Sequence, residues 1–569
     1  MSRPPREPDL EPGFASPTIV ASRRLMGPNL QHAGLGAVLD VSLDDIATER
    51  NAALLSAWHS RVRTIAAALD WPDAHTTQRL YAGGASLFLS APIDQLMTAT
   101  EVTESAWLFA EFAVFGTQQP DEGAHDLAAI SAVSVAEMQR APDGSRPVVD
   151  LWFEAARRRL NVTFDEASIT VGTGAGALEW PLDAVPSIDS INWSAVRDIP
   201  IVLVTGSNGK TTVVRMVAAM ARAAGHTVGY TCTDGVWIGD AQVEAGDYSG
   251  PAGARRVLRD PSVTLAVLET ARGGILRRGL ALQHAAVAAV VTISADHFGE
   301  YGITDLAALA DVKLVVARAV GERGTLVYNA SIPVLEAAVR RRPGRSVGVV
   351  LSDDDPTQAD LAQIPATLGG TATHNLLNAA IARAIAHELA LGPAAFDALQ
   401  RFGAQPGDNM GRLMVREVGG VTVVIDYAHN PQSVAALIHA TSGLRATRRA
   451  IALGTGGDRD DQALFEIAKA AVDSGIIDLF IAKEMPRFLR GRAAGTISDV
   501  LLSALRSLGV AEERLIGSAS DLDAVRAALA WARHGDLLLL GVHDQRDAVL
   551  ALIDALAAAD WQAGTPLPR

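Results

Sequence analysis

The segment from Val204 to Thr212 carries the residue types that bind a chain of phosphates. It reads Val-Thr-Gly-Ser-Asn-Gly-Lys-Thr-Thr and joins an apolar run, 199–204, to a helical pattern, 210–224. Its glycines let the backbone turn tightly, so that N–H groups face phosphate oxygens, and the helix N-terminus adds partial positive charge. We predict a nucleotide site in which Lys210 spans the terminal phosphates and the Thr211 hydroxyl binds Mg²⁺. The alternative is a tight glycine turn with an incidental lysine. The predicted nucleotide-binding residues here are Gly206, Ser207, Asn208, Gly209, Lys210, Thr211 and Thr212.

A carboxylate follows a second apolar run. Residues 263–268 are of the buried type, and Glu269 comes directly after them. An acidic side chain at the C-terminal end of a parallel strand lies at the edge where ligands bind. Mg²⁺ prefers hard oxygen ligands and keeps some waters, so one carboxylate, one hydroxyl and phosphate oxygens are enough to hold it. We predict that Glu269 binds the metal opposite Thr211; the alternative is a solvated glutamate at a strand end.

A histidine follows a third apolar run. His297 lies in the segment 292–299, Thr-Ile-Ser-Ala-Asp-His-Phe-Gly, after the run 286–293. A lone histidine at a strand end is more often structural than a metal ligand. Its position after another strand of the same nucleotide-binding region favours a role at a second metal ion.

Two asparagines open a later helical stretch. Asn375 and Asn378 lie in the segment 373–378, Thr-His-Asn-Leu-Leu-Asn. An asparagine amide can donate to and accept from a purine edge at the same time. We predict that Asn375 contacts the base, with Asn378 beside it in the nucleotide site. The structural alternative is a helix N-cap formed by Thr373 or Asn375.

Two polar strings follow strands in the last third of the chain. Asp-Tyr-Ala-His-Asn-Pro, 426–431, follows the run 421–425, and Gly-Thr-Gly-Gly-Asp-Arg-Asp, 454–460, follows 449–453. A turn closed by proline explains only part of the first string. In the second, backbone N–H groups could bind a carboxylate and Arg459 could pair with it bidentately. The alternative for the second string is a glycine turn with an aspartate N-cap.

These residues lie at the ends of short apolar runs that alternate with helical stretches. Such alternation predicts parallel sheets with helices on both faces. Before residue 187 the pattern is mixed, with a strand at 37–41 and helices at 46–69 and 151–160. We predict an α/β protein with an α+β N-terminal domain, a central parallel-sheet domain containing the phosphate loop, and a C-terminal Rossmann-like domain. The strands predicted for the two sheets are 199–204, 228–231, 263–268, 286–293, 324–329 and 346–351, then 421–425, 449–453, 478–482 and 536–540.

The length of 569 residues is too great for one hydrophobic core. We predict a disordered tail over 1–18, because this segment is charged and rich in proline. An N-terminal domain with a substrate or assembly role would span 19–190, a nucleotide-binding domain 191–408 and a C-terminal domain 409–569.

Composition restricts the class of partner. The net charge is −15, which argues against a general binder of nucleic acid or anionic membranes but leaves an anionic small substrate open. The N-terminus lacks a signal-type apolar core, and we expect no membrane-spanning segment. Cys232 is the only cysteine, so we expect a reducing cytoplasm and interpret this residue as a small buried hydrophobe.

Taken together, the motifs resemble those of Mur ligases. The loop has the form Gly-x-x-Gly-Lys-Thr-Thr, shorter than the common GxxxxGK loop, and 269–277 reads Glu-Thr-Ala-Arg-Gly-Gly-Ile-Leu-Arg. With Ser-x-Asp-His-x-Gly at 294–299, these segments are most similar to the Mur-like domain of cyanophycin synthetases. The resemblance covers roughly residues 195–560 by motif. Arg-Leu-Met-Gly-Pro-Asn at 24–29 also resembles a segment near the start of those synthetases.

The resemblance implies roles for individual residues. His297 would hold a second Mg²⁺, and Lys313 would be the lysine that CO₂ carbamylates; its alternative is an ordinary surface lysine. Arg412 would reach the ATP phosphates on domain closure, and Asp426 would bind the ribose. The implied substrate-binding residues are Arg272, His429, Asn430, Gly457, Asp458 and Arg459.

The chain also departs from the family pattern. Thr292 stands where the family usually has asparagine, and Met410 where the related synthetases usually have proline. A hydroxyl replaces one amide hydrogen bond but not two, so Thr292 puts substrate positioning in question. Lys483 and the Arg-Gly-Arg string at 490–492 also resemble the relatives; they would bind an acidic polymer or form a solvated basic loop, and both interpretations stay open.

These observations predict an ATP-dependent, ADP-forming ligase that joins a carboxylate to an amino acid amine through an acyl-phosphate, with ATP and two Mg²⁺ ions. The acceptor would be an acidic molecule or peptide. Because no second nucleotide motif lies between Asn29 and the Mur-like region, this chain is not expected to build a cyanophycin backbone alone. It would amidate an acidic side chain, act on a small acid or work with a partner synthetase. A homo-oligomer is the alternative to a partner synthetase. The alternatives are a folylpolyglutamate-synthase-like ligase and a non-catalytic nucleotide-binding partner of a full synthetase.

Overall fold

The computed structural model describes residues 18–44, 46–115, 145–295, 298–352, 356–405 and 407–568. All but the last residue of the predicted tail, 1–18, therefore lies outside the described residues. The chain forms two compact units. Unit 1 takes its described residues from 18–203, 229–288 and 298–324, and unit 2 from 204–228, 289–295 and 325–568.

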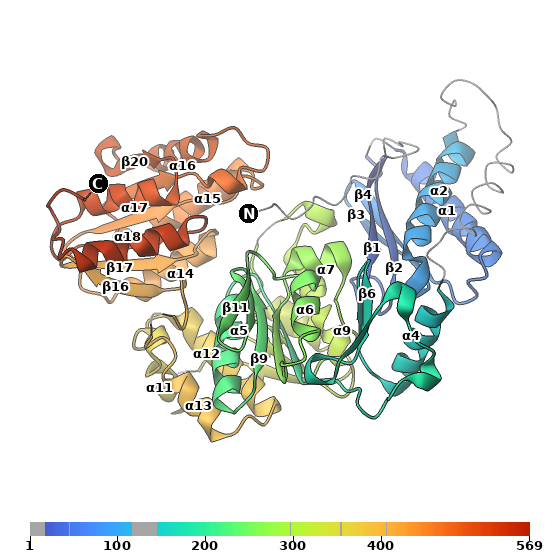
Figure 1. Ribbon diagram of the computed structural model, residues 1–569. Coiled ribbons are helices and arrows are strands. Elements are labelled where there is room, and N and C mark those ends of the chain that lie inside the picture. Colours follow the sequence, from blue (N-terminus) through green and yellow to red (C-terminus); the bar gives the residue numbers. More distant parts are fainter. Residues whose placement is uncertain are drawn as a thin grey trace. The chain divides into compact units, whose positions relative to one another are not determined.

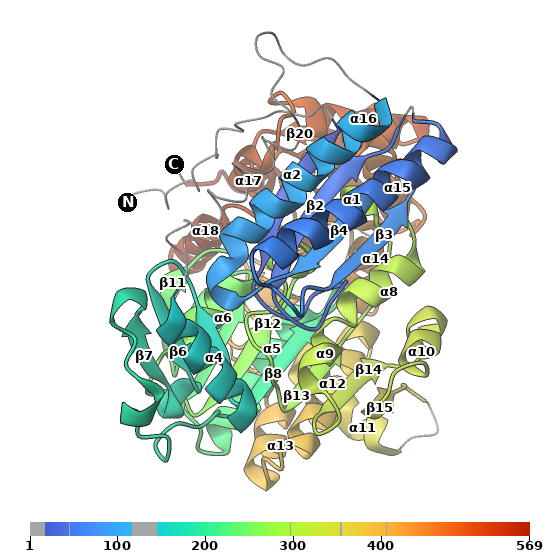
Figure 2. The same ribbon diagram turned by 90° about the vertical axis from the view of Figure 1, so that its right-hand side faces the viewer.

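Unit 1 begins with a four-stranded antiparallel sheet in the order β1-β2-β4-β3, the N-terminal sheet. Side chains alternate between its faces, so Leu39 packs against the helices while Asp40 faces the other way. Helices α1 and α2 lie side by side over the first face (Figure 2). The helix predicted at 46–69 corresponds to α1. The elements are β1 (Ile19–Leu25), β2 (Gly36–Ser42), α1 (Thr48–Ala68), β3 (Thr76–Tyr81), β4 (Gly84–Ser90) and α2 (Leu96–Phe115).

A helix and a small antiparallel sheet, β5-β6-β7, follow in unit 1. The helix predicted at 151–160 is α4, which begins earlier because Pro147 occupies its first turn, and which ends at Arg159 in a left-handed conformation. The elements are α4 (Arg146–Arg158), β5 (Val162–Phe164), β6 (Ser168–Val171) and β7 (Leu178–Pro181).

The central sheet has eight strands in the order β11-β10-β9-β12-β8-β13-β14-β15. Every strand predicted for this sheet is present. The hairpin of β10 and β11 extends it by antiparallel pairing, which the sequence analysis did not predict. The strands are β8 (Ile201–Thr205), β9 (Val228–Cys232), β10 (Gly235–Ile238), β11 (Ala241–Ala245), β12 (Leu265–Glu269), β13 (Val287–Val290), β14 (Thr325–Asn329) and β15 (Arg345–Val349). The helices of this region are α5 (Lys210–Ala223), α6 (Pro251–Leu258), α7 (Arg272–Arg278), α8 (Leu306–Lys313), α9 (Val316–Val320), α10 (Pro333–Val339), α11 (Pro356–Ala362), α12 (Thr373–Glu388) and α13 (Pro393–Gln400).

The C-terminal sheet lies in unit 2 and has the order β16-β17-β21-β18-β19-β20 (Figure 1). Strand β16 pairs antiparallel with β17, and the other pairs are parallel. This is the predicted doubly wound sheet with an added antiparallel edge. Its strands are β16 (Met414–Val418), β17 (Val421–Asp426), β18 (Arg449–Leu453), β19 (Leu479–Lys483), β20 (Leu515–Ser518) and β21 (Leu537–Gly541). Its helices are α14 (Pro431–Thr441), α15 (Asp461–Val472), α16 (Thr496–Ser507), α17 (Asp521–Trp531) and α18 (Arg546–Ala558).

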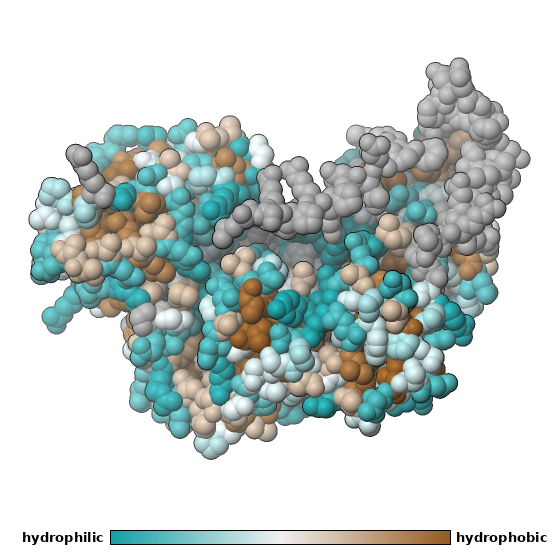
Figure 3. Space-filling model, viewed as in Figure 1, coloured by the Kyte–Doolittle hydropathy of each residue, from teal (hydrophilic) through white to brown (hydrophobic). Residues whose placement is uncertain are grey.

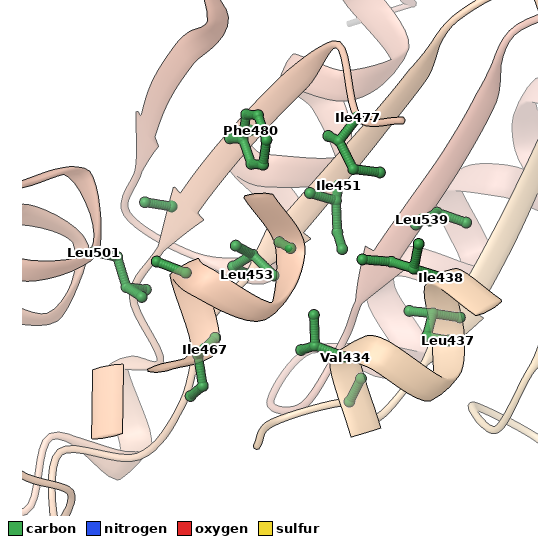
Figure 4. Packing of buried hydrophobic residues seen from close by; sticks show 14 of the residues in the cluster. Val434, Leu437, Ile438, Ile451, Leu453, Ile467, Ile477, Phe480, Leu501 and Leu539 are labelled. Carbon is green, nitrogen blue, oxygen red and sulfur yellow. The ribbon is translucent and has the colours of Figure 1, made fainter. Parts of the chain in front are cut away.

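Both faces of the C-terminal sheet carry a buried apolar layer. On one face α14, α15 and α16 contribute residues such as Leu437, Ile467 and Leu501, which pack toward the sheet residues Ile451 and Phe480 (Figure 4). Helices α17 and α18 cover the other face. Because the strands are apolar on both faces, polar side chains gather at their ends, which is where the site residues lie.

The surface is mixed. In the view of Figure 3 hydrophilic residues cover much of the molecule, and hydrophobic residues lie in separate groups. Within the described part of the chain, no helix is both long and apolar enough to cross a membrane. Cys232 is fully buried in β9, which confirms its interpretation as a small core residue.

Candidate active site

The phosphate loop joins β8 to α5 as predicted. Gly209 precedes the helix with a φ of 85°. A Cβ atom there would lie 2.4 Å from the Asn378 side-chain oxygen and 2.7 Å from Cγ1 of Val291. Only glycine fits this position, because the left-handed backbone and the close neighbours both exclude a side chain. The packing also brings Asn378, a predicted nucleotide-site residue, against the loop.

Thr292 fixes the backbone of the loop. Its hydroxyl accepts a hydrogen bond from Asn208 N at 2.8 Å and donates to Asn208 O at 2.9 Å. The Thr292 carbonyl accepts from Ser207 N at 2.8 Å. The side chain that departs from the family pattern therefore has a structural function here: it holds one residue of the loop by both its N–H and its C=O.

The first turn of α5 carries the predicted metal and phosphate groups. Lys210 Nζ donates to Ser207 O at 3.3 Å, so the ammonium group lies over its own loop. Thr211 and Thr212 are buried. These side chains lie at the N-terminus of α5, where the backbone N–H groups carry a partial positive charge that favours an anion.

The predicted residues of unit 1 that the structure describes lie at the ends of three elements. Glu269 ends β12 and is 2% exposed, so the solvated-glutamate alternative is wrong. Lys313 ends α8 and is also 2% exposed, which excludes an ordinary surface lysine. Arg272 opens α7 and pairs with Glu300 at 3.2 Å. His297 lies outside the described residues. Among the residues that are described, no group of three or more His, Cys, Asp and Glu side chains could hold a metal ion.

Asn375, the predicted base contact, is hydrogen-bonded to other groups of the protein. Asn375 is 2% exposed; its Nδ2 donates to Ala366 O at 2.7 Å and its Oδ1 accepts from Asn378 Nδ2 at 3.0 Å. The N-cap of α12 is Ala372, which has no capping side chain, so the alternative of a cap by Thr373 or Asn375 is wrong. The contact of Asn375 with a base stays a prediction.

The linker at the predicted domain junction is hydrogen-bonded to α5, and the sequence analysis missed these contacts. Arg215 of α5 donates to Met410 O at 2.9 Å and to Asn409 Oδ1 at 3.4 Å. Asn409 Nδ2 in turn donates to Thr212 Oγ1 at 3.4 Å. A charged residue within the apolar stretch of α5 was the only sequence signal. These bonds hold the linker just before Arg412.

The string that begins at Asp426 forms a compact loop after β17. Oδ2 of Asp426 accepts from Leu413 N at 2.6 Å. Burial raises the pKa of Asp426 above its ordinary value, although Arg412 and backbone hydrogen bonds oppose this. The Arg412 guanidinium stacks on the ring of Tyr427, with Cζ 4.0 Å from the ring centroid. His429 Nδ1 lies 2.9 Å from Tyr427 O. The predicted Arg412 and Asp426 are thus brought together.

Asn430 has two partners in different parts of unit 2. Its Oδ1 accepts from Ser433 N at 2.9 Å in a capping box that starts α14. Its Nδ2 donates to Asn208 Oδ1 of the phosphate loop at 3.1 Å. Asn430 is therefore the N-cap of a helix rather than part of a simple turn closed by proline, and the same side chain also contacts the phosphate loop.

The loop 454–460 packs against the segment after β19. Gly457 N donates to Phe488 O at 2.8 Å, so this N–H is already bonded and cannot bind a carboxylate as predicted. Asp458 pairs with Arg490 at 2.8 Å. The last residue of the loop, Asp460, caps α15 by accepting from Ala463 N, as the structural alternative expected. Arg459 is the remaining predicted carboxylate contact.

Lys483 and the nearby arginines do not form one basic surface. Lys483 is completely buried, so it cannot bind an acidic polymer. Arg490 pairs with Asp458, and Arg492 pairs with Asp461 at 2.7 Å. The interpretation as a solvated basic loop holds only in part, because these two arginines are tied to the preceding loop.

In unit 1 the segment 24–29 docks on the end of α7. Met26 N donates to Arg278 O and Leu280 N donates to Pro28 O, both at 2.8 Å. A Cβ on Gly27 would lie 2.2 Å from Leu280 O, so this backbone approach requires glycine. The segment 24–29 therefore meets the chain directly after the string 269–277, although the two are far apart in sequence.

A second contact of the N-terminal sheet reaches the residues that follow His297. Arg79 of β3 donates to the carbonyls of Tyr301 and Gly302. On the same face Arg23 pairs with Asp40, and its guanidinium stacks on the Tyr301 ring at 4.6 Å. Burial lowers the pKa of Arg79 from its usual value. The contacts of Arg79 gave no motif, because its partners Tyr301 and Gly302 are more than two hundred positions away.

A buried polar cluster joins β5 to the end of the loop before β13. Asn161 Oδ1 accepts from Gln283 N and His284 N, both at 2.8 Å. Asn161 Nδ2 donates to Asp198 Oδ2 at 3.0 Å. Burial raises the pKa of Asp198 to about 6, despite hydrogen bonds from Asn161 and Thr173.

Comparison with known proteins places this site in a family. Residues 204–386 match the Mur ligase middle domain, and residues 411–541 match the Mur ligase, glutamate ligase domain. A UDP-N-acetylmuramoylalanine–D-glutamate ligase of Methylococcus capsulatus is 30% identical over 357 residues, which are 60% of this chain and 67% of that protein. The chain belongs to the Mur ligase family.

Higher identity is found with cyanophycin synthetases. That of Geminocystis herdmanii is 34% identical over 382 residues, which are 60% of this chain, and that of a Nostoc species is 35% identical over 337 residues. The chain spans about 42% of the length of the first of these relatives. Among solved structures, E. coli FolC with DHPP and ADP gives a TM-score of 0.45 at 20% identity, over 63% of this chain and 89% of that one. MurF ligase from Thermotoga maritima with ADP gives 0.44 at 16% identity, over 63% and 81%.

Proposed function

We propose that this chain is an ATP-dependent ligase that joins a carboxylate to the amine of an amino acid and releases ADP and phosphate. The observation that carries the proposal is the way the phosphate loop is held. The Thr292 hydroxyl is hydrogen-bonded to the backbone N–H and C=O of Asn208. Asn430, at the start of α14, donates to the Asn208 side chain. A loop fixed in this way at a helix N-terminus supports binding of a nucleoside triphosphate, and membership of the Mur ligase family supports the same function.

The loop residues have roles that follow from their charge. Lys210 would neutralise the terminal phosphates, and Arg412 would add a second cation to the phosphoryl group in transfer. Glu269 is the last residue of β12, and β12 is a neighbour of β8 in the central sheet. The Glu269 carboxylate and the Thr211 hydroxyl are hard oxygen donors that fit Mg²⁺, which would supply charge neutralisation at the phosphates when bound. His297 and a carbamylated Lys313 are the proposed members of a second metal centre.

The chemistry needs activation of the acid. A carboxylate oxygen of the acid would attack the γ-phosphorus of ATP, and ADP would leave. The amine would then attack the acyl carbon of the acyl-phosphate, lose a proton and expel phosphate, leaving an amide. The residues of the site would act by positioning and charge neutralisation. Arg272 and Arg459 are the proposed carboxylate contacts, and the acceptor is an acidic molecule or peptide.

Turnover of defined acid and amine pairs tests the proposal. The full chain is mixed with MgATP and pairs of amino acids and acidic peptides, and both phosphate and amide are measured. We expect phosphate release that depends on a pair and equals the amide formed. Lys210→Ala should abolish it, and Lys469→Ala, which changes a lysine on the exposed side of α15, should not.

Three results would point elsewhere. ADP release without an amide from any pair would overturn the ligase proposal. Turnover with a pterin acid would favour a folylpolyglutamate-synthase-like ligase. Tight nucleotide binding without turnover would favour a non-catalytic partner of another synthetase.

A further inference from the structure

A buried ionic network lies at the strand ends of the C-terminal sheet. The side chains of Lys483, at the end of β19, and Asp521, at the start of α17, are both 0% exposed. Lys483 Nζ is 2.5 Å from Asp521 Oδ1 and 2.9 Å from Nδ1 of His543. The residues are up to 60 positions apart in sequence, and the proposed mechanism uses none of them.

The Asp521 carboxylate accepts hydrogen bonds from three consecutive backbone N–H groups. Its Oδ2 accepts from the N–H groups of His543, Asp544 and Gln545 at 2.9, 2.6 and 2.9 Å. Burial alone would raise its pKa, but Lys483 and these hydrogen bonds lower it to about 2. Asp521 is therefore ionised. Burial lowers the pKa of Lys483, and the adjacent Asp521 carboxylate opposes this. The ion pair of Lys483 Nζ with Asp521 Oδ1 at 2.5 Å is the contact of an ammonium group with a carboxylate.

A network of this kind is weak evidence for stability. Removing two charges from water costs about as much as their attraction returns, and well-packed apolar residues often replace such a pair without loss. Stability alone therefore does not account for the network, and the geometry of His543 indicates another role.

Lys483 determines the tautomer of His543. An ammonium group only donates, so Nδ1 of His543 must accept, and the ring proton is on Nε2. Nε2 lies 3.1 Å from the carbonyl oxygen of Ala428 and donates to it. Burial, followed by the charge of Lys483, holds the pKa of His543 well below its ordinary value, so the ring stays neutral.

Ala428 belongs to the loop that carries the site residues. The His543 ring contacts the Tyr427 ring edge-on, with centroids 4.8 Å apart. The Tyr427 ring in turn supports the Arg412 guanidinium at 4.0 Å. A continuous path of contacts therefore runs from Lys483 through His543 and Tyr427 to Arg412.

We propose that Lys483, Asp521 and His543 are positioning residues, which fix the backbone at Ala428 and the ring of Tyr427 and thereby set where Arg412 presents its charge. The inference rests on the proposed function for the role of Arg412, but the positioning itself is testable by nucleotide affinity alone. His543 acts by one hydrogen bond and one ring contact, and it transfers no proton.

A double-mutant cycle tests the path. Tyr427→Leu removes the ring, and we expect it to weaken binding of a non-hydrolysable ATP analogue, and to slow any turnover, by about tenfold. In an Arg412→Ala background the same change should have little further effect, because both act through one guanidinium. Tyr427→Phe keeps the ring and should recover most of the loss.

Three further variants separate positioning from general damage. Trp531→Leu removes a comparable stack, that of Arg448 at 3.9 Å, and should leave nucleotide affinity unchanged. His543→Phe keeps the packing on Tyr427 but loses the bond to Ala428, so it should reproduce part of the Tyr427→Leu effect. Because Lys483→Met would leave Asp521 buried without its cation, the double variant Lys483→Met with Asp521→Asn is used instead.

The outcomes are distinguishable. Additive effects of Tyr427→Leu and Arg412→Ala, or wild-type affinity of both His543→Phe and the double variant, would overturn the inference. Nitrogen NMR that puts the His543 proton on Nδ1 would overturn it as well. If the wild type never forms an amide, the proposed function fails, while the cycle on nucleotide affinity still decides the positioning.

Discussion

Replacement of Thr292 by valine would remove the hydroxyl that fixes the phosphate loop without changing the shape of the side chain. In the wild type this hydroxyl satisfies Asn208 N at 2.8 Å and Asn208 O at 2.9 Å. The variant therefore leaves one backbone donor and one acceptor unsatisfied in a half-buried loop. Each buried group left in this way costs about 1–3 kcal/mol, and water reaches a half-buried site, so we expect about 2 kcal/mol in total.

Most of this cost should appear in nucleotide affinity, because the free loop then samples conformations that do not bind phosphate. A loss of about 2 kcal/mol corresponds to roughly thirtyfold weaker binding. Titration calorimetry with ADP and with a non-hydrolysable ATP analogue measures it, and thermal melting reports the accompanying loss of stability.

Two variants at the same position serve as controls. Thr292→Ser keeps the hydroxyl and should bind nucleotide almost as the wild type does. Thr292→Asn restores the residue usual in the family and tests whether an amide can replace the hydroxyl. If Thr292→Val binds nucleotide as tightly as Thr292→Ser, the hydroxyl does not hold the loop and the reasoning is wrong.

Three more predictions concern the contacts described above. Asn430→Ala loses a helix cap, typically about 1 kcal/mol, and the bond to Asn208; we expect a lower melting temperature and weaker ATP-analogue binding, whereas Asn430→Asp should keep the cap and recover the melting temperature only. Arg79→Leu frees the carbonyls of Tyr301 and Gly302, so amide hydrogen exchange should rise over 298–303; unchanged exchange there would contradict the contact. The pKa of Asp198 is about 6 in the folded chain against an ordinary value of 3.8, so the folded state binds more protons between these pH values and stability falls as pH rises from about 4 to 6. Urea unfolding of Asp198→Asn should lack this fall, and a parallel pH dependence in both proteins would refute it.

The phosphate loop and the parallel strands could be predicted because both are local in sequence. The loop is recognisable by its glycine and lysine spacing, and each buried strand is a short apolar run next to a helical stretch. The hairpin of β10 and β11 was not predicted, because Ala241–Ala245 is mostly exposed and contains no apolar run. An edge strand such as β11, which buries few side chains, lacks the apolar pattern by which a strand is recognised in the sequence.

Long-range polar partners could not be predicted. Asn430 was expected in the active site or in a turn; it caps α14 and also donates to Asn208, because one amide has a donor and an acceptor directed to different neighbours. Lys483 was expected to be exposed; burial beside Asp521 depends on a residue 38 positions later, which no local pattern records. Gly457 was expected to donate its N–H to a ligand, but this N–H donates to Phe488 O in the segment after β19.

The docking of residues 24–29 on the end of α7 limits how the chain can be divided. A shortened protein starting at residue 191 would lose the partners of Arg278 O and Leu280 N, and without Asn161 the N–H groups of Gln283 and His284 would also go unsatisfied. Such a fragment would expose these unsatisfied backbone groups to solvent close to the Glu-Thr-Ala-Arg-Gly-Gly string. The Mur ligase domains are therefore not separable from the N-terminal part without loss of these hydrogen bonds, and chimaeras with related proteins should exchange both sides of this contact together.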